Sequence, residues 1–142
     1  YKVDIFKLES PVDSSDLEKD ISKETETAFK ELASATNNTP WVVLSSGMGK
    51  KSFIKCLELA FKNGASGYLA GRTIWLDAFK NYPNIENVDK GLKNESVNYI
   101  NQLNDLTARS AYSLETYFEK GFKIKEPEQF TKNFGGFKWL VI

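Results

Sequence analysis

The stretch "WVVLSSGMGKKSFIKCLELAFKNG", residues 41–64, decides the fold, because its hydrophobic pattern changes at the glycines. It opens with a continuous apolar run, which is typical of a strand buried on both faces of a parallel sheet. After the loop, apolar residues recur at helical spacing, and the closing Asn63-Gly64 pair is a common helix stop. The stretch therefore predicts a strand over 41–46, a flexible loop and a helix.

The segment before this stretch predicts a further unit of the same kind. Residues 1–10, "YKVDIFKLES", combine β-branched and aromatic residues with a partly alternating pattern, which indicates a strand. Ser15 and Glu18 then form a capping box that predicts the start of a helix. That helix is expected to end at "ATNNTP", residues 35–40, where asparagines and a proline break the pattern.

A third unit follows the central stretch. The segment "SGYLAG", residues 66–71, predicts a strand, and a short helix is expected from Arg72 to about Lys80. Three successive strand, loop and helix units predict an α/β fold with a parallel sheet and right-handed crossovers.

The rest of the chain predicts a helical extension. We expect one domain of βα units over residues 1–90 and a C-terminal helical extension over 91–142. A long surface helix is indicated by residues near heptad spacing: Val97, Ile100, Leu103, Thr107, Ala111, Leu114 and Phe118. The apolar end of the tail has no partner in the pattern.

Composition excludes several classes of protein. The chain has 142 residues, 19 Lys and Arg against 19 Asp and Glu, and thus no bias toward nucleic acid. It contains no histidine, which removes Ser/His/Asp triads and histidine-ligated zinc. Its one cysteine, Cys56, fits a reducing compartment and is predicted to be a buried, inert thiol. With no apolar run long enough for a membrane span, we expect a cytoplasmic protein.

The loop at 45–52 resembles a nucleotide-binding loop but fails its test. In G-x-x-x-x-G-K-[ST], a hydroxyl residue must follow the lysine to reach magnesium. If Gly49-Lys50 were the GK pair, Leu44 would stand at the first glycine and Lys51 at the hydroxyl position. The lysine pair is therefore interpreted as a solvated helix start.

The loop still suits a phosphate group. Two predicted strands end in small residues at matching places, which are Ser45, Ser46 and Gly47 in one and Ala70 and Gly71, followed by Arg72, in the other. In an eight-stranded β/α barrel, the loops after the last two strands commonly bind phosphate through backbone amides and a helix N-terminus. The alternative is that the glycines turn tight corners and Arg72 forms a salt bridge at the rim.

Lys7 is an unusual residue for the middle of a strand. It points to the opposite side from Phe6 and Leu8, and so into a barrel interior if those two face the helices. A desolvated amine there can become a nucleophile that forms a Schiff base with a carbonyl. The alternative is an ion pair with Glu9, which lies on the same face.

Three segments together resemble a known family. "DIFKLESPV" at 4–12, "TPWVVLSSGM" at 39–48 and "GASGYLAGRTIW" at 64–75 are similar to class I aldolases of the tagatose 1,6-bisphosphate type and their sulfofructose-phosphate-cleaving relatives. The resemblance implies the C-terminal part of a (β/α)8 TIM barrel, about three βα units, followed by the long C-terminal helix. The three predicted strands would then be the sixth, seventh and eighth of that barrel.

The resemblance also implies roles for the residues. Lys7 would be the catalytic Schiff-base lysine, with Glu9 as a neighbour, and the substrate phosphate would be bound by Ser45, Ser46, Gly47, Gly71 and Arg72. The implied enzyme is a lyase of carbohydrate metabolism that cleaves a phosphorylated ketose to dihydroxyacetone phosphate and an aldehyde. A lysine imine takes the place of a metal ion, so no metal or other cofactor is expected.

The family barrel would place five strands before residue 1, with the proton-transfer groups on them. We therefore expect this chain to be inactive alone, and to form homo-oligomers or to associate with the missing N-terminal half. The expected ligand is a phosphorylated ketose, and we expect no binding to nucleic acid or to a membrane. Two alternatives are a non-catalytic sugar-phosphate-binding or interaction module and a small doubly wound domain. Trp41 and Trp75 are predicted to be core or helix-interface residues.

Overall fold

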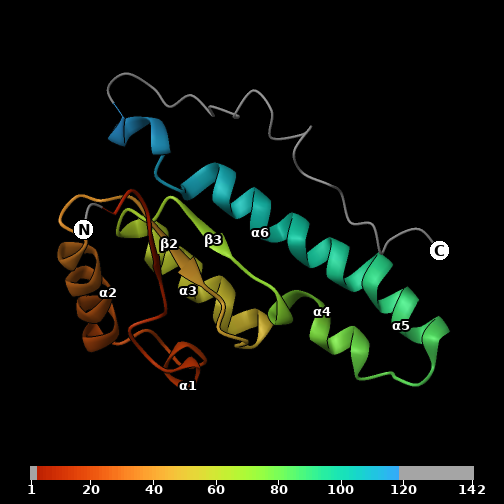
Figure 1. Cartoon of the computed structure of the whole chain (residues 1–142). Helices are drawn as coiled ribbons and strands as arrows, with labels where there is room; N and C mark the ends of the chain where they lie inside the picture. The colour runs from red at the N-terminus through yellow and green to blue at the C-terminus, as the bar shows by residue number, and fades with distance from the viewer. Residues whose placement is uncertain (1–2, 119–142) are drawn as a thin grey trace, which may run out of the picture.

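Three parallel strands form one sheet whose spatial order, β1-β2-β3, is also their order along the chain. The computed structural model describes residues 3–118, and Figure 1 shows how its elements are arranged. The strands are β1 (Phe6–Leu8), β2 (Trp41–Leu44) and β3 (Gly67–Leu69). The helices are α1 (Ser14–Leu17), α2 (Lys23–Ala35), α3 (Lys50–Lys62), α4 (Arg72–Phe79), α5 (Ile85–Gly91) and α6 (Val97–Ser110). The predicted parallel α/β arrangement is therefore confirmed for these units.

The register of the sheet places alternate residues on opposite faces. Lys7 pairs with Val42, and Val42 pairs with Gly67, so these three form one row across the sheet. The neighbouring row consists of Leu8, Val43 and Tyr68. Because consecutive side chains of a strand point to opposite faces, the two rows face opposite sides of the sheet.

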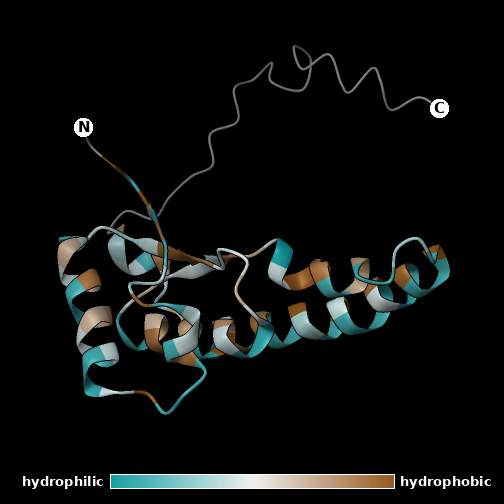
Figure 2. Cartoon of the chain, turned by 90° about the horizontal axis from the view of Figure 1, so that it is seen from below, coloured by the Kyte–Doolittle hydropathy of each residue, from teal (hydrophilic) through white to brown (hydrophobic). Residues whose placement is uncertain are grey.

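One face of the sheet is packed against helices and carries the hydrophobic core. Figure 2 shows helices running below the strands, with further helices beside them. Side chains that are 1% exposed or less come from β2 and from the helices α1, α2, α3 and α6. They include Leu17, Phe29, Trp41, Val43, Phe53, Cys56, Leu57 and Leu103. This burial confirms the predictions that Trp41 is a core residue and that Cys56 is buried. The Tyr68 hydroxyl also donates a hydrogen bond of 2.7 Å to Asn104 Oδ1, which links β3 to α6.

The other face of the sheet is open among the described residues. Lys7 is exposed, Val42 and Leu44 are half-buried, and Leu69 is 47% exposed. The expectation that residues 41–46 are buried on both faces is therefore wrong for this face, because no described element packs closely over it. Apolar side chains at this level of exposure leave room for further packing.

The predicted helix after β1 is two helices. The capping box of Ser15 and Glu18 does not form, because α1 ends at Leu17 and Glu18 follows it as the C-cap. Instead, Ser22 caps α2, and its Oγ accepts a hydrogen bond of 3.1 Å from the backbone N–H of Thr25. A serine followed three residues later by a polar residue occurs twice in this segment, as Ser15 with Glu18 and as Ser22 with Thr25. The second of these pairs starts the long helix α2.

The predicted helix stops are confirmed. After α2, Asn37 and Asn38 take positive φ values of 48° and 61°, which asparagine tolerates better than most residues. Asn63 is the C-cap of α3, and Gly64 follows with a φ of 90°. The predicted start of α4 at Arg72 is confirmed, and its end at Phe79 agrees with the expected position to one residue.

The helical run after α4 extends from α5 through a π-helical turn, η1 (Leu92–Ser96), into α6. At Gly91 the run approaches α4 closely, since a Cβ there would lie 2.9 Å from the Cβ of Ala78. The predicted apolar stripe is wrong beyond Ser110, because Ala111 is extended and the Tyr112 N–H donates to Ala65 O at 2.9 Å. A short 3-10 helix, η2 (Leu114–Tyr117), follows, and the tail lies outside the described residues.

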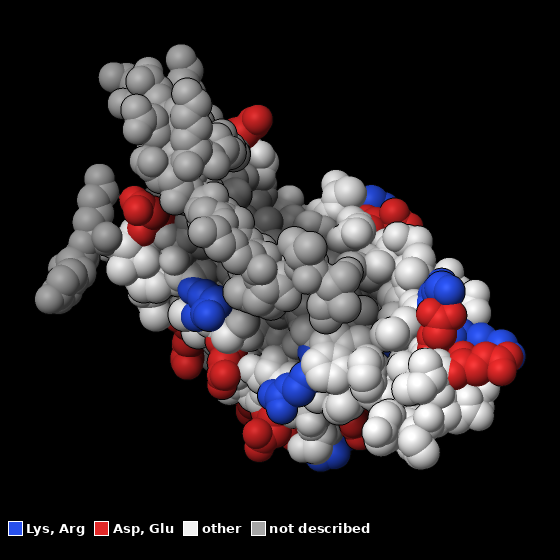
Figure 3. All heavy atoms as spheres, turned by 45° about the vertical axis from the view of Figure 1, so that its right-hand side comes forward, with Lys and Arg blue, Asp and Glu red and all other residues white. Residues whose placement is uncertain are grey.

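The visible surface carries mixed charge. Figure 3 shows lysine and arginine side chains interspersed with aspartate and glutamate on the face that it presents. Two pairs of this kind, Lys90 with Glu86 and Lys93 with Asp89, join side chains one turn apart along α5 and η1. Within residues 3–118, no helix is both long enough and apolar enough to cross a membrane.

Candidate functional site

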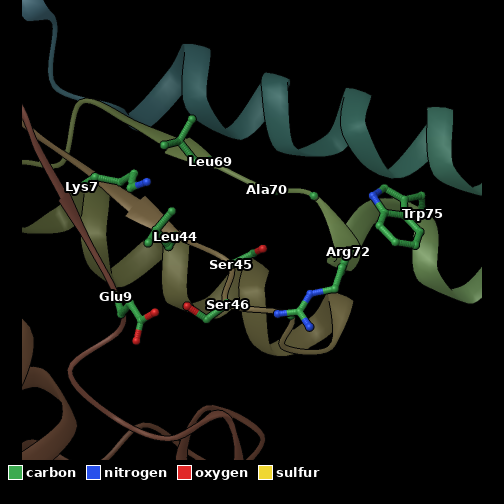
Figure 4. A pocket seen from close by; sticks show the side chains of 11 residues that line it. Lys7, Glu9, Leu44, Ser45, Ser46, Leu69, Ala70, Arg72 and Trp75 are labelled. Atoms are coloured by element: carbon green, nitrogen blue, oxygen red, sulfur yellow. The ribbon is translucent and has the colours of Figure 1, made fainter.

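A cavity of about 530 Å³ lies at the edge of the sheet where the parallel strands end. Figure 4 shows side chains from β1, from the loops after β2 and β3, and from α4 around it. The lining residues are Lys7, Glu9, Leu44, Ser45, Ser46, Gly47, Leu69, Ala70, Gly71, Arg72 and Trp75. All seven site residues predicted from the sequence are therefore brought together in one cavity. Ligand sites of α/β proteins lie at this end of the strands.

The loop after β2 is a tight turn whose amides are free to bind an anion. Ser46 and Gly47 both have positive φ values, 46° and 79°, and the Met48 N–H donates to Ser45 O at 2.9 Å. Among the residues that the structure describes, the amides of Ser46 and Gly47 have no hydrogen-bond acceptor. Successive free amides in such a turn form a concave site for anions.

Arg72 lies over this turn and fixes the residue type at position 47. A Cβ added to Gly47 would lie 3.3 Å from both Cζ and Nη2 of the Arg72 guanidinium. In Figure 4 the guanidinium extends from the start of α4 toward the loop that contains Ser46. Gly47 is therefore needed for two reasons, its left-handed backbone and the space for Arg72. The guanidinium and the free amides offer donors to the same cavity.

Ser45 is a buried polar residue with an unused hydroxyl. Its side chain lines the cavity although the residue is 4% exposed. Its backbone N–H donates to Leu69 O at 3.0 Å, which joins the ends of β2 and β3. No partner for the hydroxyl occurs within residues 3–118. Among the described residues only the Ser66 hydroxyl is both fully buried and without a partner, so the Ser45 hydroxyl is open to the cavity, where it can donate to or accept from a ligand oxygen.

Lys7 reaches the same cavity from β1. Figure 4 shows its amine directed across the open face of the sheet, while the carboxylate of Glu9 points elsewhere. None of the ion pairs formed by the described residues involves Lys7 or Glu9, so the alternative of an ion pair between them is not observed. The amine is thus available to a ligand in the cavity.

Comparison with known proteins gives a family for this arrangement. Residues 1–77 match the family described as DeoC/LacD family aldolase, which covers more than half of the chain. The chain belongs to this aldolase family. The matched range contains Lys7 and both loops of the cavity, whereas α5, α6 and the tail lie outside it.

Several relatives of this chain are named tagatose 1,6-diphosphate aldolases. "Tagatose 1,6-diphosphate aldolase 2" of Enterococcus faecalis is 31% identical over 125 residues, covering 80% of this chain and 37% of that protein. "Tagatose 1,6-diphosphate aldolase 1" of the same organism is 30% identical over 129 residues, covering 84% and 39%. The enzyme of Lactococcus lactis is 28% identical, covering 78% and 37%. This aldolase-family chain thus spans less than two fifths of the length of these relatives.

Trp75 is the lining residue whose position the sequence analysis missed. It was predicted to be packed in a core or a helix interface, but its side chain is 38% exposed and lines the cavity. Its ring makes an edge-to-face contact with Phe79, with the ring centres 5.4 Å apart. The available signal was its spacing, because Trp75 lies one helical turn after Gly71, on the same side of α4.

The two loops of the site are linked by side chains behind them. Thr73, 6% exposed, donates a hydrogen bond of 2.9 Å from Oγ1 to the carbonyl of Met48. The Lys50 amine lies 3.4 Å from Asp77 and 5.6 Å from the centre of the Tyr99 ring. Lys50 therefore joins α3 to α4 and α6 and does not line the cavity, contrary to its interpretation as a solvated residue. The ammonium groups of Lys80 and Lys50 hold the pKa of Asp77 below its usual value.

The remaining chemistry of the described part of the chain lies away from the cavity. Within residues 3–118, no group of three or more histidine, cysteine, aspartate or glutamate residues could hold a metal ion. Burial raises the pKa of the Cys56 thiol to about 11, which disfavours the reactive thiolate. The groups that remain for chemistry in the cavity are an amine, a carboxylate, hydroxyls, amides and a guanidinium.

Proposed function

We propose that this chain carries the Schiff-base lysine and the phosphate site of a class I aldolase that cleaves a phosphorylated ketose. The supporting observation is that one cavity is lined by the Lys7 amine and by the anion-binding groups of the two loops. An amine alone or a phosphate site alone has many uses, but the two in one cavity suit a phosphorylated carbonyl compound. The names of the relatives favour a ketose 1,6-bisphosphate as substrate, with dihydroxyacetone phosphate and an aldehyde as products.

The proposed reaction begins with the amine of Lys7. Its lone pair attacks the ketose carbonyl carbon, and the resulting carbinolamine takes up a proton and loses water to form a protonated imine, a proton that hydrolysis of the imine later returns. A base removes the proton of the hydroxyl on the fourth carbon, the bond between the third and fourth carbons breaks, and its electron pair moves into the imine. The aldehyde leaves, and an enamine remains on Lys7. Protonation of its third carbon and hydrolysis of the imine release dihydroxyacetone phosphate and restore the amine.

The phosphate site fixes the carbonyl carbon within reach of the lysine. The amides of Ser46 and Gly47, the Ser45 hydroxyl and the Arg72 guanidinium surround one end of the cavity, and Lys7 comes from the neighbouring strand β1. Holding one end of the substrate converts attack by the amine into a step within a single complex, which lowers its entropic cost. Arg72 and the amides serve binding, and Lys7 serves the bond-making step.

We further propose that the three strands belong to a (β/α)8 barrel. The outer edges of β1 and β3 pair with no other described strand, and the open face carries half-buried apolar residues. The relatives are much longer than the matched region, which leaves room for the other strands and for the groups that transfer protons. On this proposal the 142-residue chain binds phosphate compounds but has little or no aldolase activity without those strands or a partner that supplies them.

The test compares two variants of a chain extended at its N-terminus to the length of the relatives. Lys7→Ala is expected to abolish cleavage of tagatose 1,6-bisphosphate, a loss of at least about 1000-fold, because no other group replaces the covalent step. The same variant is expected to retain affinity for dihydroxyacetone phosphate within about threefold.

Arg72→Met is the matched variant for the binding half of the site. This variant is expected to bind dihydroxyacetone phosphate at least about tenfold more weakly, since a charge-assisted hydrogen bond to the phosphate is lost. Turnover by the Lys7→Ala variant at the rate of the unsubstituted chain would overturn the aldolase proposal and would leave a non-catalytic sugar-phosphate-binding module.

A further inference from the structure

Trp75 is a large aromatic residue at an exposed position beside the proposed phosphate site. Its side chain is 38% exposed and lines the same cavity as Gly71 and Arg72. We propose that the Trp75 indole N–H is a further ligand of the substrate phosphate. This inference rests on the proposed function and adds to it a donor that neither the family match nor the sequence pattern assigns.

The geometry directs the nitrogen edge of the ring toward the start of α4. A Cβ placed on Gly71, the N-cap of α4, would have the Trp75 Nε1 as its neighbour at 4.0 Å. Figure 4 shows this nitrogen on the side of the ring that faces the chain at Ala70. An anion bound at the start of α4 would therefore meet the indole N–H as well as the positive end of the helix.

The indole N–H has no other use within the described part of the chain. No hydrogen bond from Trp75 Nε1 occurs in residues 3–118. Indole nitrogen is a donor without acceptor capacity, so its best partner is a group rich in acceptors, and a phosphate has such oxygens. The Arg72 guanidinium and the backbone amides that line the same cavity are also donors, so an anion can accept from all of them, while Figure 4 shows the Glu9 carboxylate on the opposite side of the cavity from Trp75.

The ring is held in place for this role. Phe79, one turn further along α4, packs edge-to-face on it. The start of α4 is itself tied to the opposite loop by the hydrogen bond from Thr73 to Met48 O, at 2.9 Å. The indole therefore lies on a helix whose position relative to the Ser46–Gly47 turn is fixed.

The experiment follows binding of dihydroxyacetone phosphate to the 142-residue chain by ¹H–¹⁵N NMR. The chain has three tryptophans, and a Trp75→Phe variant assigns the indole signal of Trp75 by its loss. The inference predicts that ligand moves this signal downfield and that Trp75→Phe, which keeps a ring but loses the donor, weakens binding about five- to tenfold. Leu76→Ala is the control, since Leu76 is 43% exposed on the same helix but does not line the cavity.

The outcomes separate this inference from the proposed function. If Arg72→Met weakens binding while Trp75→Phe stays within twofold, or if the indole signal does not move, the inference is overturned and the phosphate site stands. If the unsubstituted chain does not bind the ligand, or Arg72→Met binds it equally well, the phosphate site and the inference both fail. Should Trp75→Phe fail to fold, as judged by circular dichroism, the Trp75 indole signal is assigned in the unsubstituted chain by its nuclear Overhauser effect to the Phe79 ring, and its movement decides.

Discussion

The two faces of the sheet are built from the same strands but have opposite uses. On the helix-covered face, Trp41 and Val43 are 1% exposed or less, and their neighbours are apolar. On the open face, Lys7 is exposed and Leu69 is 47% exposed. Successive residues of a strand alternate between the two faces. Of two neighbours in the sequence, one therefore lies in the core and contributes to stability, and the other lies on the open face and is available for chemistry. Substitutions on the two faces should therefore give effects of different kinds.

The largest effect is expected from a cavity in the covered face. Phe53 is fully buried and packs edge-to-face on Tyr68, with ring centres 6.0 Å apart. Phe53→Ala should lower the free energy of unfolding by about 3–5 kcal/mol, because the core loses a large side chain and cannot collapse around the gap. Urea denaturation measures this. Leu69→Ala, on the open face, is the matched control and should cost less than about 1 kcal/mol in the 142-residue chain. Equal losses would mean that the two faces are equally packed.

The next effect is a loss of stability in alkali that arises from Cys56 in the covered face. Burial raises the pKa of its thiol to about 11 from the ordinary value of 9.0. The folded state therefore holds this proton more tightly than the unfolded state, and the contribution is complete below pH 9 and is lost as the pH rises through about 11. The expected loss is about 2–3 kcal/mol over this range.

Denaturation curves from pH 8 to pH 11 measure that loss, and Cys56→Ala is the control. The alanine variant should lose the decline that begins at pH 9 and retain only the one that begins above pH 10 and comes from tyrosines, since burial also raises the pKa values of Tyr68, Tyr99 and Tyr117. The same pH dependence in both variants would mean that the thiol is not desolvated in the folded state.

A smaller effect on stability, with a larger one on binding, is expected at the turn on the open side. Gly47→Ala places a side chain at a φ of 79° and 3.3 Å from the Arg72 guanidinium. The strain should cost about 1–2 kcal/mol of unfolding free energy. Displacement of Arg72 should also lower the affinity for dihydroxyacetone phosphate about tenfold, and calorimetry measures this affinity. Gly49→Ala, where a Cβ meets Ser52 Oγ at 4.0 Å, should leave the affinity unchanged. Equal affinities for both variants would remove the turn from the site.

The sequence predicted those parts of the molecule whose signals are local. The strand β2, the loop Ser45–Gly47 and the helix α3 follow one another within 41–64, so apolar period and glycine position were enough to predict them. The start of α4 at Arg72 was equally clear. Because parallel strands end at one edge of a sheet, the predicted site residues were expected together, and they line one cavity.

Other parts depend on contacts that the sequence does not display. The sequence indicates Ser15 as the cap of the first helix, whereas in the structure α1 ends before Glu18 and Ser22 caps the long helix α2. The helix α6 ends at Ser110 because Tyr112 bonds to Ala65, more than forty residues earlier in the chain. The residue type of Trp75 favours packing, and its spacing of one helical turn from Gly71 indicates a position beside the site only once the start of α4 is known to border the cavity.

The central claim is that Lys7 forms a Schiff base, and borohydride trapping tests it most directly. The N-terminally extended chain is mixed with dihydroxyacetone phosphate, the imine is reduced with borohydride to a stable amine, and intact mass and peptide mapping locate the adduct. We predict a single adduct on the peptide that contains Lys7, and none in the Lys7→Ala variant. An adduct that persists in Lys7→Ala, or no adduct on the extended chain while it cleaves the ketose, would contradict the claim.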